Sequence, residues 1–456
     1  MSIEIIASAP NAALPIWLVE KGGLEHSKIS SEAKSWAIAN SFNGSAGALL
    51  VLPGNDGHVS GVVFGLGAGD DSLIFGRLAT TLPNGVWSFA DVPAKPELAM
   101  LGFMLGGYRF DAYKAADKSR KVVLVAPANV DVAAIKRQAE AVALARDLIN
   151  TPANDMGPEA IENAVRSVAG KFKAKTKVTL GPQLIKQNFP MIHAVGRAAS
   201  ESPRLIDITW GSKSAPKITL VGKGVAFDTG GLDIKPSSSM LLMKKDMGGA
   251  ANVLALGALI MGAGLKVRLR ILIPAVENSI SANAFRPGDV LSSRKGITVE
   301  IGNTDAEGRL ILADALALAD EEGPEILIDM ATLTGAARVA LGPDLPPFYT
   351  DDDALADALS DAGDKVEDPI WRMPLWKPYE SKLASKIADT NNVTTDGFAG
   401  SITAALFLKK FVSKAKTWAH FDIFGWNPVE KAHAPVGGEA QAIRAIFEVL
   451  QQRYPA

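Results

Sequence analysis

Two glycine-flanked segments of this sequence gather polar and charged side chains that are costly to bury. The first runs from Gly222 to Gly231 and continues to Asp246, and the second runs from Asn303 to Arg309. Four of their acidic residues are candidate metal ligands: Asp228, Asp246, Asp305 and Glu307. Carboxylate oxygens suit Mn²⁺ and Mg²⁺, and Zn²⁺ also accepts them. Because four carboxylates balance the charge of two divalent ions, the pattern favours a two-metal site that holds a water nucleophile.

Asp305 and Glu307 are separated by one residue, so in extended chain their side chains project to the same side. Adjacent carboxylates repel each other unless a positive group lies between them, and Arg309 or a divalent metal could supply that charge. A second interpretation is that the pair caps and charges the start of the following helix. Lys223, Lys235 and Arg309 could likewise be simple counter-ions for the acids.

Other kinds of site have less support. Gly222-Lys223-Gly224 lacks the Ser/Thr after lysine and the four-residue spacer of a phosphate loop, and Asp228 would repel a phosphate. The absence of cysteine excludes thiolate zinc sites, disulfides and a cysteine nucleophile. The histidines show no paired ligand spacing and are interpreted as structural or surface residues; they are His26, His58, His193, His420 and His433.

Alternating strands and helices are predicted to position these residues. Apolar runs predict strands at Ile16–Val19, Leu49–Leu52, Val122–Val125, Ile218–Val221, Leu269–Ile273, Ile297–Ile301, Ile326–Ile328 and Trp418–Ile423. Helices are predicted at Gly249–Ile260, Arg309–Asp320 and Ile402–Val412. The predicted fold class is α/β, with a small N-terminal α/β domain and a larger C-terminal α/β catalytic domain whose mixed sheet is flanked by helices. Ligands in such sheets bind beyond the carboxyl ends of the strands.

The predicted domains are residues 1–130, a linker helix at 131–150, and a catalytic domain at 151–456. The linker carries apolar residues at near-helical period from Ile135 to Ile149 and stops before Pro152. The 456 residues include 47 Lys plus Arg and 49 Asp plus Glu, so no basic surface charge favours nucleic acid. The N-terminus lacks signal-peptide features, and uncharged Met247–Leu265 is interpreted as a buried core helix, so a cytoplasmic protein without membrane association is expected.

The stretch from Asn303 to Leu310 resembles, without a mismatch, the signature of the leucyl aminopeptidase family, the M17-type cytosolic metallo-aminopeptidases. The resemblance covers residues 146–426 and is weak in the N-terminal domain. It implies hydrolysis of the N-terminal residue of peptides by a metal-bridging hydroxide, and a homohexamer. It also implies two ions per subunit, Mn²⁺ or Zn²⁺, with five ligands: Lys223, Asp228, Asp246, Asp305 and Glu307.

The same resemblance implies that Lys235 and Arg309 are the catalytic pair, with a bicarbonate held by Arg309 as the general base. Lys235 would stay charged and stabilise the oxyanion. Lys223 could ligate a metal only as the neutral amine, so the ions would have to lower its pKa from about 10.4 to below neutrality. Such ions would also lower the pKa of a bound water to about 7.

Met243, Thr332 and Gly335 are implied to line the pocket for the first residue, and Asn303 and Leu333 to contact the substrate backbone. This pocket would be an apolar slot with room for leucine or methionine.

Two departures leave the substrate preference open. Asp233 stands where relatives carry a small polar or neutral residue. On an extended strand it would face the same side as Lys235, where it could damp the lysine's charge or attract a basic substrate residue. The bulky run from Ile423 to Trp426 changes the pocket's far wall. The rival hypotheses are a DNA-binding relative, against which the charge balance argues, and an inactive homologue, against which the retained ligands argue.

Overall fold

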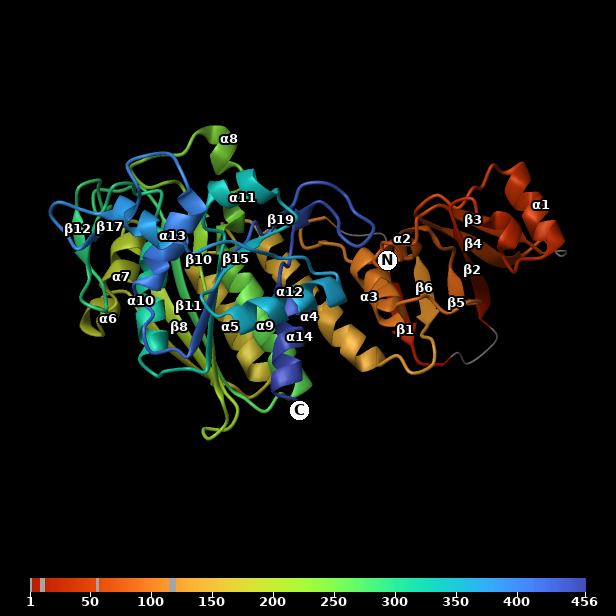
Figure 1. The fold of residues 1–456 in the computed structure, drawn as a ribbon, viewed down its shortest axis with the longest axis horizontal. Helices are drawn as coiled ribbons and strands as arrows, with labels where there is room; N and C mark the ends of the chain where they lie inside the picture. Colours follow the sequence, from red (N-terminus) through yellow and green to blue (C-terminus); the bar gives the residue numbers. More distant parts are fainter. Residues whose placement is uncertain (1, 9–12, 55–56, 115–119) are drawn as a thin grey trace. The chain divides into compact units, whose positions relative to one another are not determined.

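The computed structural model describes residues 2–8, 13–54, 57–114 and 120–456 (Figure 1). The chain divides into two compact units, Met1–Ala143 with Pro428–Val436 and Leu144–Asn427 with Gly437–Ala456. The boundary between Ala143 and Leu144 falls within helix α4 (Val132–Asn150). Both units combine strands with helices, which confirms the predicted α/β class.

The first unit contains a six-stranded sheet. Its strand order is β1 (Ser2–Ile6), β6 (Lys121–Val125), β5 (Gly85–Phe89), β2 (Leu14–Glu20), β4 (Val59–Gly67) and β3 (Leu49–Pro53). All neighbours are parallel except β3 and β4. The helices are α1 (Ser31–Ala39), α2 (Gly76–Thr81) and α3 (Pro96–Gly106). The three strands predicted in this region coincide with β2, β3 and β6.

The second unit contains a nine-stranded mixed sheet. Eight strands run in the order β16 (Trp371–Arg372), β15 (Pro347–Tyr349), β18 (Thr417–Asp422), β14 (Ile326–Ala331), β9 (Lys217–Gly222), β11 (Arg268–Asn278), β8 (Arg204–Trp210) and β7 (Lys175–Leu180). Strand β10 (Gly224–Asp228) pairs with β11. The central strands β18, β14, β9 and β11 are parallel, so their carboxyl ends share one edge of the sheet.

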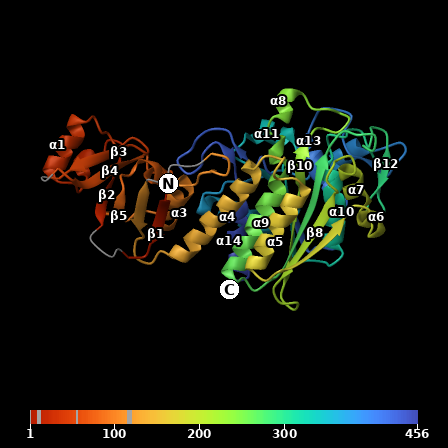
Figure 2. The ribbon, with the colours of Figure 1, turned by 180° about the vertical axis from the view of Figure 1, so that it is seen from behind.

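Helices cover both faces of this sheet, as predicted (Figures 1 and 2). One layer contains α5 (Pro158–Lys171), α9 (Gly248–Ala263), α12 (Asp353–Val366) and α14 (Ile443–Arg453). The other contains α7 (Pro190–Gly196), α10 (Gly308–Asp320) and α13 (Gly400–Lys409). Both α9 and α10 contact strands β9 and β14. These two helices begin next to the two glycine-flanked segments, which fixes where those segments meet the sheet.

Helix α9 is apolar on all sides because it is buried on all sides. Together with the one-turn helix η2 (Met243–Met247) it forms the one candidate membrane span among the described residues, Met243–Ala263, and 83% of its apolar window is buried inside the structure. A core helix has this character. The interpretation of residues 247–265 as a buried helix is therefore supported.

Some predicted elements differ from the observed ones. The run Ile297–Ile301 does form a strand, β13 (Thr298–Glu300), but β13 pairs with β12 (Val290–Ser292) and β17 (Thr390–Asn391) in a separate small sheet. The predicted helix Ile402–Val412 begins two residues earlier and ends at Lys409, because residues 410 and 411 form a turn. Short elements complete the fold: α6 (Gln183–Lys186), α8 (Ser237–Met240), α11 (Gly335–Leu341), β19 (Trp426–Asn427) and β20 (Gly437–Gly438).

His420 illustrates the structural role expected of the histidines. It is fully buried on β18, and its Nδ1 lies 2.6 Å from Asp329 Oδ1 on β14. Trp418 Nε1 donates to the other oxygen of Asp329 at 2.8 Å. Burial lowers the pKa of His420, but the Asp329 carboxylate outweighs this effect and raises the pKa above its usual value. The pair joins neighbouring strands of the sheet and lies outside the acid cluster.

Candidate active site

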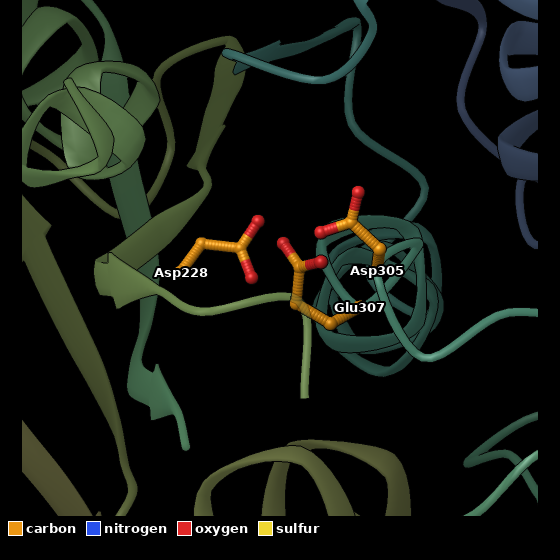
Figure 3. Close-up of side chains that lie close together, drawn as sticks. All are labelled: Asp228, Asp305 and Glu307. Carbon is orange, nitrogen blue, oxygen red and sulfur yellow. The ribbon is translucent and has the colours of Figure 1, made fainter. Parts of the chain in front are cut away.

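Three carboxylates from distant parts of the chain converge at the carboxyl edge of the large sheet (Figure 3). Asp228 is the last residue of β10, and Asp305 and Glu307 precede α10. One oxygen atom from each of the three lies within 4.8 Å of the others. Asp228 and Glu307 are buried, and Asp305 is half-buried. The structure thus brings together three of the four acids selected from the sequence as one cluster.

The backbone around Asp305 is a turn, so the expectation of extended chain was wrong. Thr304 and Asp305 form the turn, and the Asp305 N–H donates to Asn303 Oδ1 at 2.7 Å. This arrangement lets two side chains converge although the chain between them is not a strand. Glu307 is the N-cap residue of α10, but its side chain makes no capping hydrogen bond. The interpretation of Glu307 as a simple helix cap is therefore not supported.

Lys223 connects the fourth acid, Asp246, to this cluster. Its Nζ lies 2.7 Å from Asp246 Oδ2 and 2.9 Å from Glu307 Oε1, and it donates to Thr332 O at 3.1 Å. The lysine stem passes over Gly308, where an added Cβ would lie only 2.4 Å from Lys223 Cε. Gly308 in the signature segment is thus required by the close approach of the lysine.

Lys235 provides the second positive charge inside the cluster. Its Nζ lies 2.9 Å from Asp228 Oδ2 and 2.5 Å from Asp305 Oδ1. Burial lowers the pKa of Lys235, but these two carboxylates reverse the effect and raise the pKa above its usual value. The side chain is therefore charged at neutral pH. It is Lys223 and Lys235, not Arg309, that lie between the carboxylates.

The donor set fits divalent cations. Both oxygens of Glu307 are buried and receive no directed hydrogen bond from the described residues. Lys223 is the cation that contacts Glu307 Oε1 and Asp246 Oδ2. Burial, together with the charge of Asp228, raises the pKa of Glu307 to about 8 and that of Asp305 to about 6. Such crowding of acids is costly without concentrated positive charge. Hard anionic oxygens in this arrangement are ligands that Mn²⁺ and Zn²⁺ accept.

Asp233 lies in a loop, so the expectation of an extended strand was wrong. Its Oδ2 accepts the N–H of Thr304 at 2.7 Å. Its own N–H donates to Thr304 Oγ1 at 2.9 Å. Thr304 Oγ1 also lies 2.6 Å from Gly230 O. Asp233 therefore joins the loop after β10 to the turn that carries Asp305, and it also lines the cavity beside the carboxylates.

Replacing Asp233 by alanine should loosen this turn. We expect Asp233→Ala to lower kcat/KM by roughly 10–100-fold, as for residues that orient metal ligands. It should also lower the free energy of unfolding by about 1–3 kcal/mol, because the Thr304 amide loses its acceptor. Steady-state kinetics and urea unfolding measure the two effects. Asp233→Asn keeps an acceptor oxygen and serves as the control with a smaller loss; equal behaviour of Asp233→Ala and the unmodified protein would contradict this role.

The residues expected to contact substrate line one cavity of about 440 Å³ together with the acid cluster. They are Met243, Asn303, Thr332, Leu333 and Gly335. The Leu333 N–H donates to Asp422 Oδ1 at 3.0 Å. The structure thus gathers the predicted pocket residues beside the carboxylates.

Arg309 lines a different cavity, of about 520 Å³, which shares Asn303 with the first. Its guanidinium donates from Nη1 to Asn392 O at 2.5 Å, and its buried Nε has no hydrogen-bond partner among the described residues. Burial lowers the pKa of Arg309 to about 10, so it remains charged at neutral pH.

Sequence reasoning missed several residues that shape the site. Asn278, at the end of β11, donates to Asp228 Oδ1 at 2.8 Å and to Thr304 O at 3.1 Å. Asn392 receives the N–H groups of Gly302 and Asn303 on its Oδ1. Lys245 and Arg338 line the cavity of the acid cluster, together with Phe424 of the run from Ile423 to Trp426 that was expected at the pocket's far wall. Only the position of Asn278 at a strand's carboxyl end could have suggested its role from sequence.

The fold and site together define an α/β protein with a buried carboxylate cluster suited to metal-assisted hydrolysis. Comparison with known families agrees. Residues 143–447 match the model of the cytosol aminopeptidase family, catalytic domain, and residues 14–127 match the M17 aminopeptidase N-terminal domain. The chain therefore belongs to the cytosol aminopeptidase (M17) family, and it is an aminopeptidase.

Individual relatives support this assignment over most of the chain. A probable cytosol aminopeptidase of Corynebacterium efficiens is 37% identical over 430 residues, covering 90% of this chain and 85% of the relative. The crystal structure of cytosol aminopeptidase from Coxiella burnetii has a TM-score of 0.94 and 46% identity, covering 99% of both chains. The bottromycin maturation enzyme BotP in complex with Mn has a TM-score of 0.88 and 32% identity, covering 97% of this chain and 100% of that one.

Proposed function

We propose that this aminopeptidase is metal-dependent and removes the first residue of peptides with two divalent ions, Mn²⁺ or Zn²⁺. The ligands would be Lys223, Asp228, Asp246, Asp305 and Glu307. The observation that carries the proposal is the convergence of the acids on Lys223 and Lys235, with buried Glu307 oxygens that receive no directed hydrogen bond from the described residues. The Mn complex of the BotP relative supports the choice of metal.

Bound ions would supply a water of lowered pKa as the nucleophile. The chain's own contribution centres on Lys235, whose ammonium is held at the cluster and stays charged. It is placed to stabilise the negative charge that develops on the scissile carbonyl oxygen. Lys223 would act as a ligand only after losing its proton. In the protein without ions, the carboxylates of Asp246 and Glu307 stabilise the protonated form of Lys223.

Arg309 is proposed to hold a bicarbonate as the general base. Its Nε, which has no hydrogen-bond partner in the described part of the chain, and its charge support anion binding in the cavity it shares with Asn303. For the first residue of the substrate we propose acceptance of leucine-like and other apolar side chains in the pocket lined by Met243, Thr332 and Gly335. We further propose a linker helix at residues 131–150 between two domains, a homohexamer as in the family, and a cytoplasmic location.

Removal of metal tests the proposal directly. Dialysis against a chelator should lower hydrolysis of leucine amide-type substrates by at least about a hundredfold. Bound metal ions contribute several kcal/mol to transition-state stabilisation, and their removal loses that contribution. Adding back Mn²⁺, Zn²⁺ or Co²⁺ in parallel should restore activity and show which ion supports it. Undiminished turnover in the chelated protein, verified to be metal-free, would end the metal-dependent mechanism.

A further inference from the structure

The far end of the substrate cavity contains two positive side chains that the proposed mechanism does not use. Lys245, in the one-turn helix η2, is only 6% exposed and lines the cavity. Arg338, on α11, lines the same cavity and is exposed. Lys245 Nζ lies 4.7 Å from the centroid of the Phe424 ring, and Arg338 Cζ lies 5.2 Å from it. Phe424 thus brings the two cations into one corner.

No direct ion pair within the described chain holds these two cations. None of the ion pairs formed within residues 2–8, 13–54, 57–114 and 120–456 includes Lys245 or Arg338. The carboxylates of Asp246 and Asp422 attract Lys245 without forming an ion pair with it. Asp422 accepts hydrogen bonds from uncharged donors: the N–H groups of Leu333 and Thr334 and the hydroxyls of Thr334 and Ser401. A buried ammonium without a direct ion-pair partner is costly, so its presence in a cavity points to an anionic ligand group.

The position of the pair relates it to the side chain of the first substrate residue. Lys245 and Met243, both in η2, line the same cavity. Arg338 follows Gly335 by three residues on α11, which places these two on one side of the helix, and both line this cavity as well. Thr332, the third pocket residue, is tied to η2 through its hydroxyl, which donates to Asp246 Oδ1 at 2.8 Å. The basic corner therefore closes the pocket for the first residue.

We propose that Lys245 and Arg338 bind the carboxylate of an N-terminal glutamate, so that the enzyme removes acidic as well as apolar first residues. The inference rests on the proposed function, because it takes the pocket lined by Met243, Thr332 and Gly335 as the one that receives the first substrate residue. Glutamate combines a methylene stem that can pack on Met243 with a terminal carboxylate that can reach the basic corner. Aspartate is shorter and should be a poorer substrate than glutamate.

Aminoacyl arylamides of Glu, Gln, Met and Leu test the proposal with the metal-loaded enzyme. They carry no C-terminal carboxylate, so the comparison of Glu with isosteric Gln isolates the charge of the first side chain. We expect kcat/KM for Glu to exceed that for Gln by roughly tenfold, the size of one charge-assisted contact. Lys245→Met and Arg338→Gln should each lower the Glu/Gln ratio severalfold or more, and this ratio separates the loss of charge recognition from any general loss of activity.

Lys244→Met is the matched control, because Lys244 donates to Asn150 O and does not line the cavity. The control should leave the Glu/Gln ratio unchanged. A wild-type enzyme that hydrolyses Leu and Gln substrates but prefers Gln to Glu would overturn the inference and leave the proposed function intact. Retention of the wild-type ratio in both the Lys245 and Arg338 variants would overturn it as well. Failure to hydrolyse any of the four substrates would instead overturn the proposed function.

Discussion

Glu307→Gln is expected to lower kcat/KM by at least about a thousandfold, which corresponds to about 4 kcal/mol of transition-state stabilisation. Glutamine has the same shape but carries no charge, and it offers one oxygen where the carboxylate offers two. Both carboxylate oxygens of Glu307 are buried and receive no directed hydrogen bond from the described residues, and Lys223 forms an ion pair with Oε1. As a proposed ligand of two ions, Glu307 would need both oxygens.

The same substitution should not unfold the protein. Burial and Asp228 already raise the pKa of Glu307 to about 8, which means that the charge is costly in the absence of metal. A neutral side chain removes that cost, so the chelated variant should unfold at the same temperature as the chelated wild type or above it. Metal content, circular dichroism and kinetics distinguish a lost ligand from a lost fold.

Asp305→Asn should behave in the same way, and the surface substitution Asp351→Asn is a suitable control. Asp351 is exposed and pairs with Lys409 at 2.8 Å, away from the cavity. The control should retain full activity and full metal content. Normal turnover by the Glu307 or Asp305 variant would remove the basis for a carboxylate-bound metal site.

Lys235→Met should lower kcat by roughly 10²–10³-fold, the loss seen when one oxyanion donor is removed. Its effect on KM should be small, because the lysine is proposed to act on charge that appears only in the transition state. Lys235→Arg keeps the charge in a larger, planar group and should recover part of the loss. Steady-state kinetics at saturating metal measure this split between kcat and KM.

Metal content decides how the Lys235 result is interpreted. Lys235 pairs with Asp228 and Asp305, so its removal leaves both acids with less positive charge and should favour, not weaken, cation binding. We therefore expect full metal occupancy in the Lys235→Met variant. Lys386→Met, at an exposed position, serves as the neutral control. A rise in KM with unchanged kcat would show that Lys235 binds substrate without stabilising the oxyanion.

Local sequence pattern was sufficient for the framework and for the acids of the site. Apolar runs identified strands β9, β11, β14 and β18, and all-round apolarity identified the buried helix α9. The glycine-flanked acids Asp228, Asp305 and Glu307 stood out because charged residues next to buried strands are rare unless they have a function. These signals are local, and each depends on residues within a few positions of one another.

Tertiary structure alone decided which side chains meet. Asp233 and Thr304 are 71 positions apart, and their contact became possible only when the loop after β10 and the turn before α10 met at one edge of the sheet. Arg309 follows Glu307 by two positions, yet the helix directs it into another cavity. Lys245, Arg338 and Phe424 come from three distant segments and show no common pattern in sequence. Strand order and loop packing set such contacts, and neither is encoded in the spacing of residues along the chain.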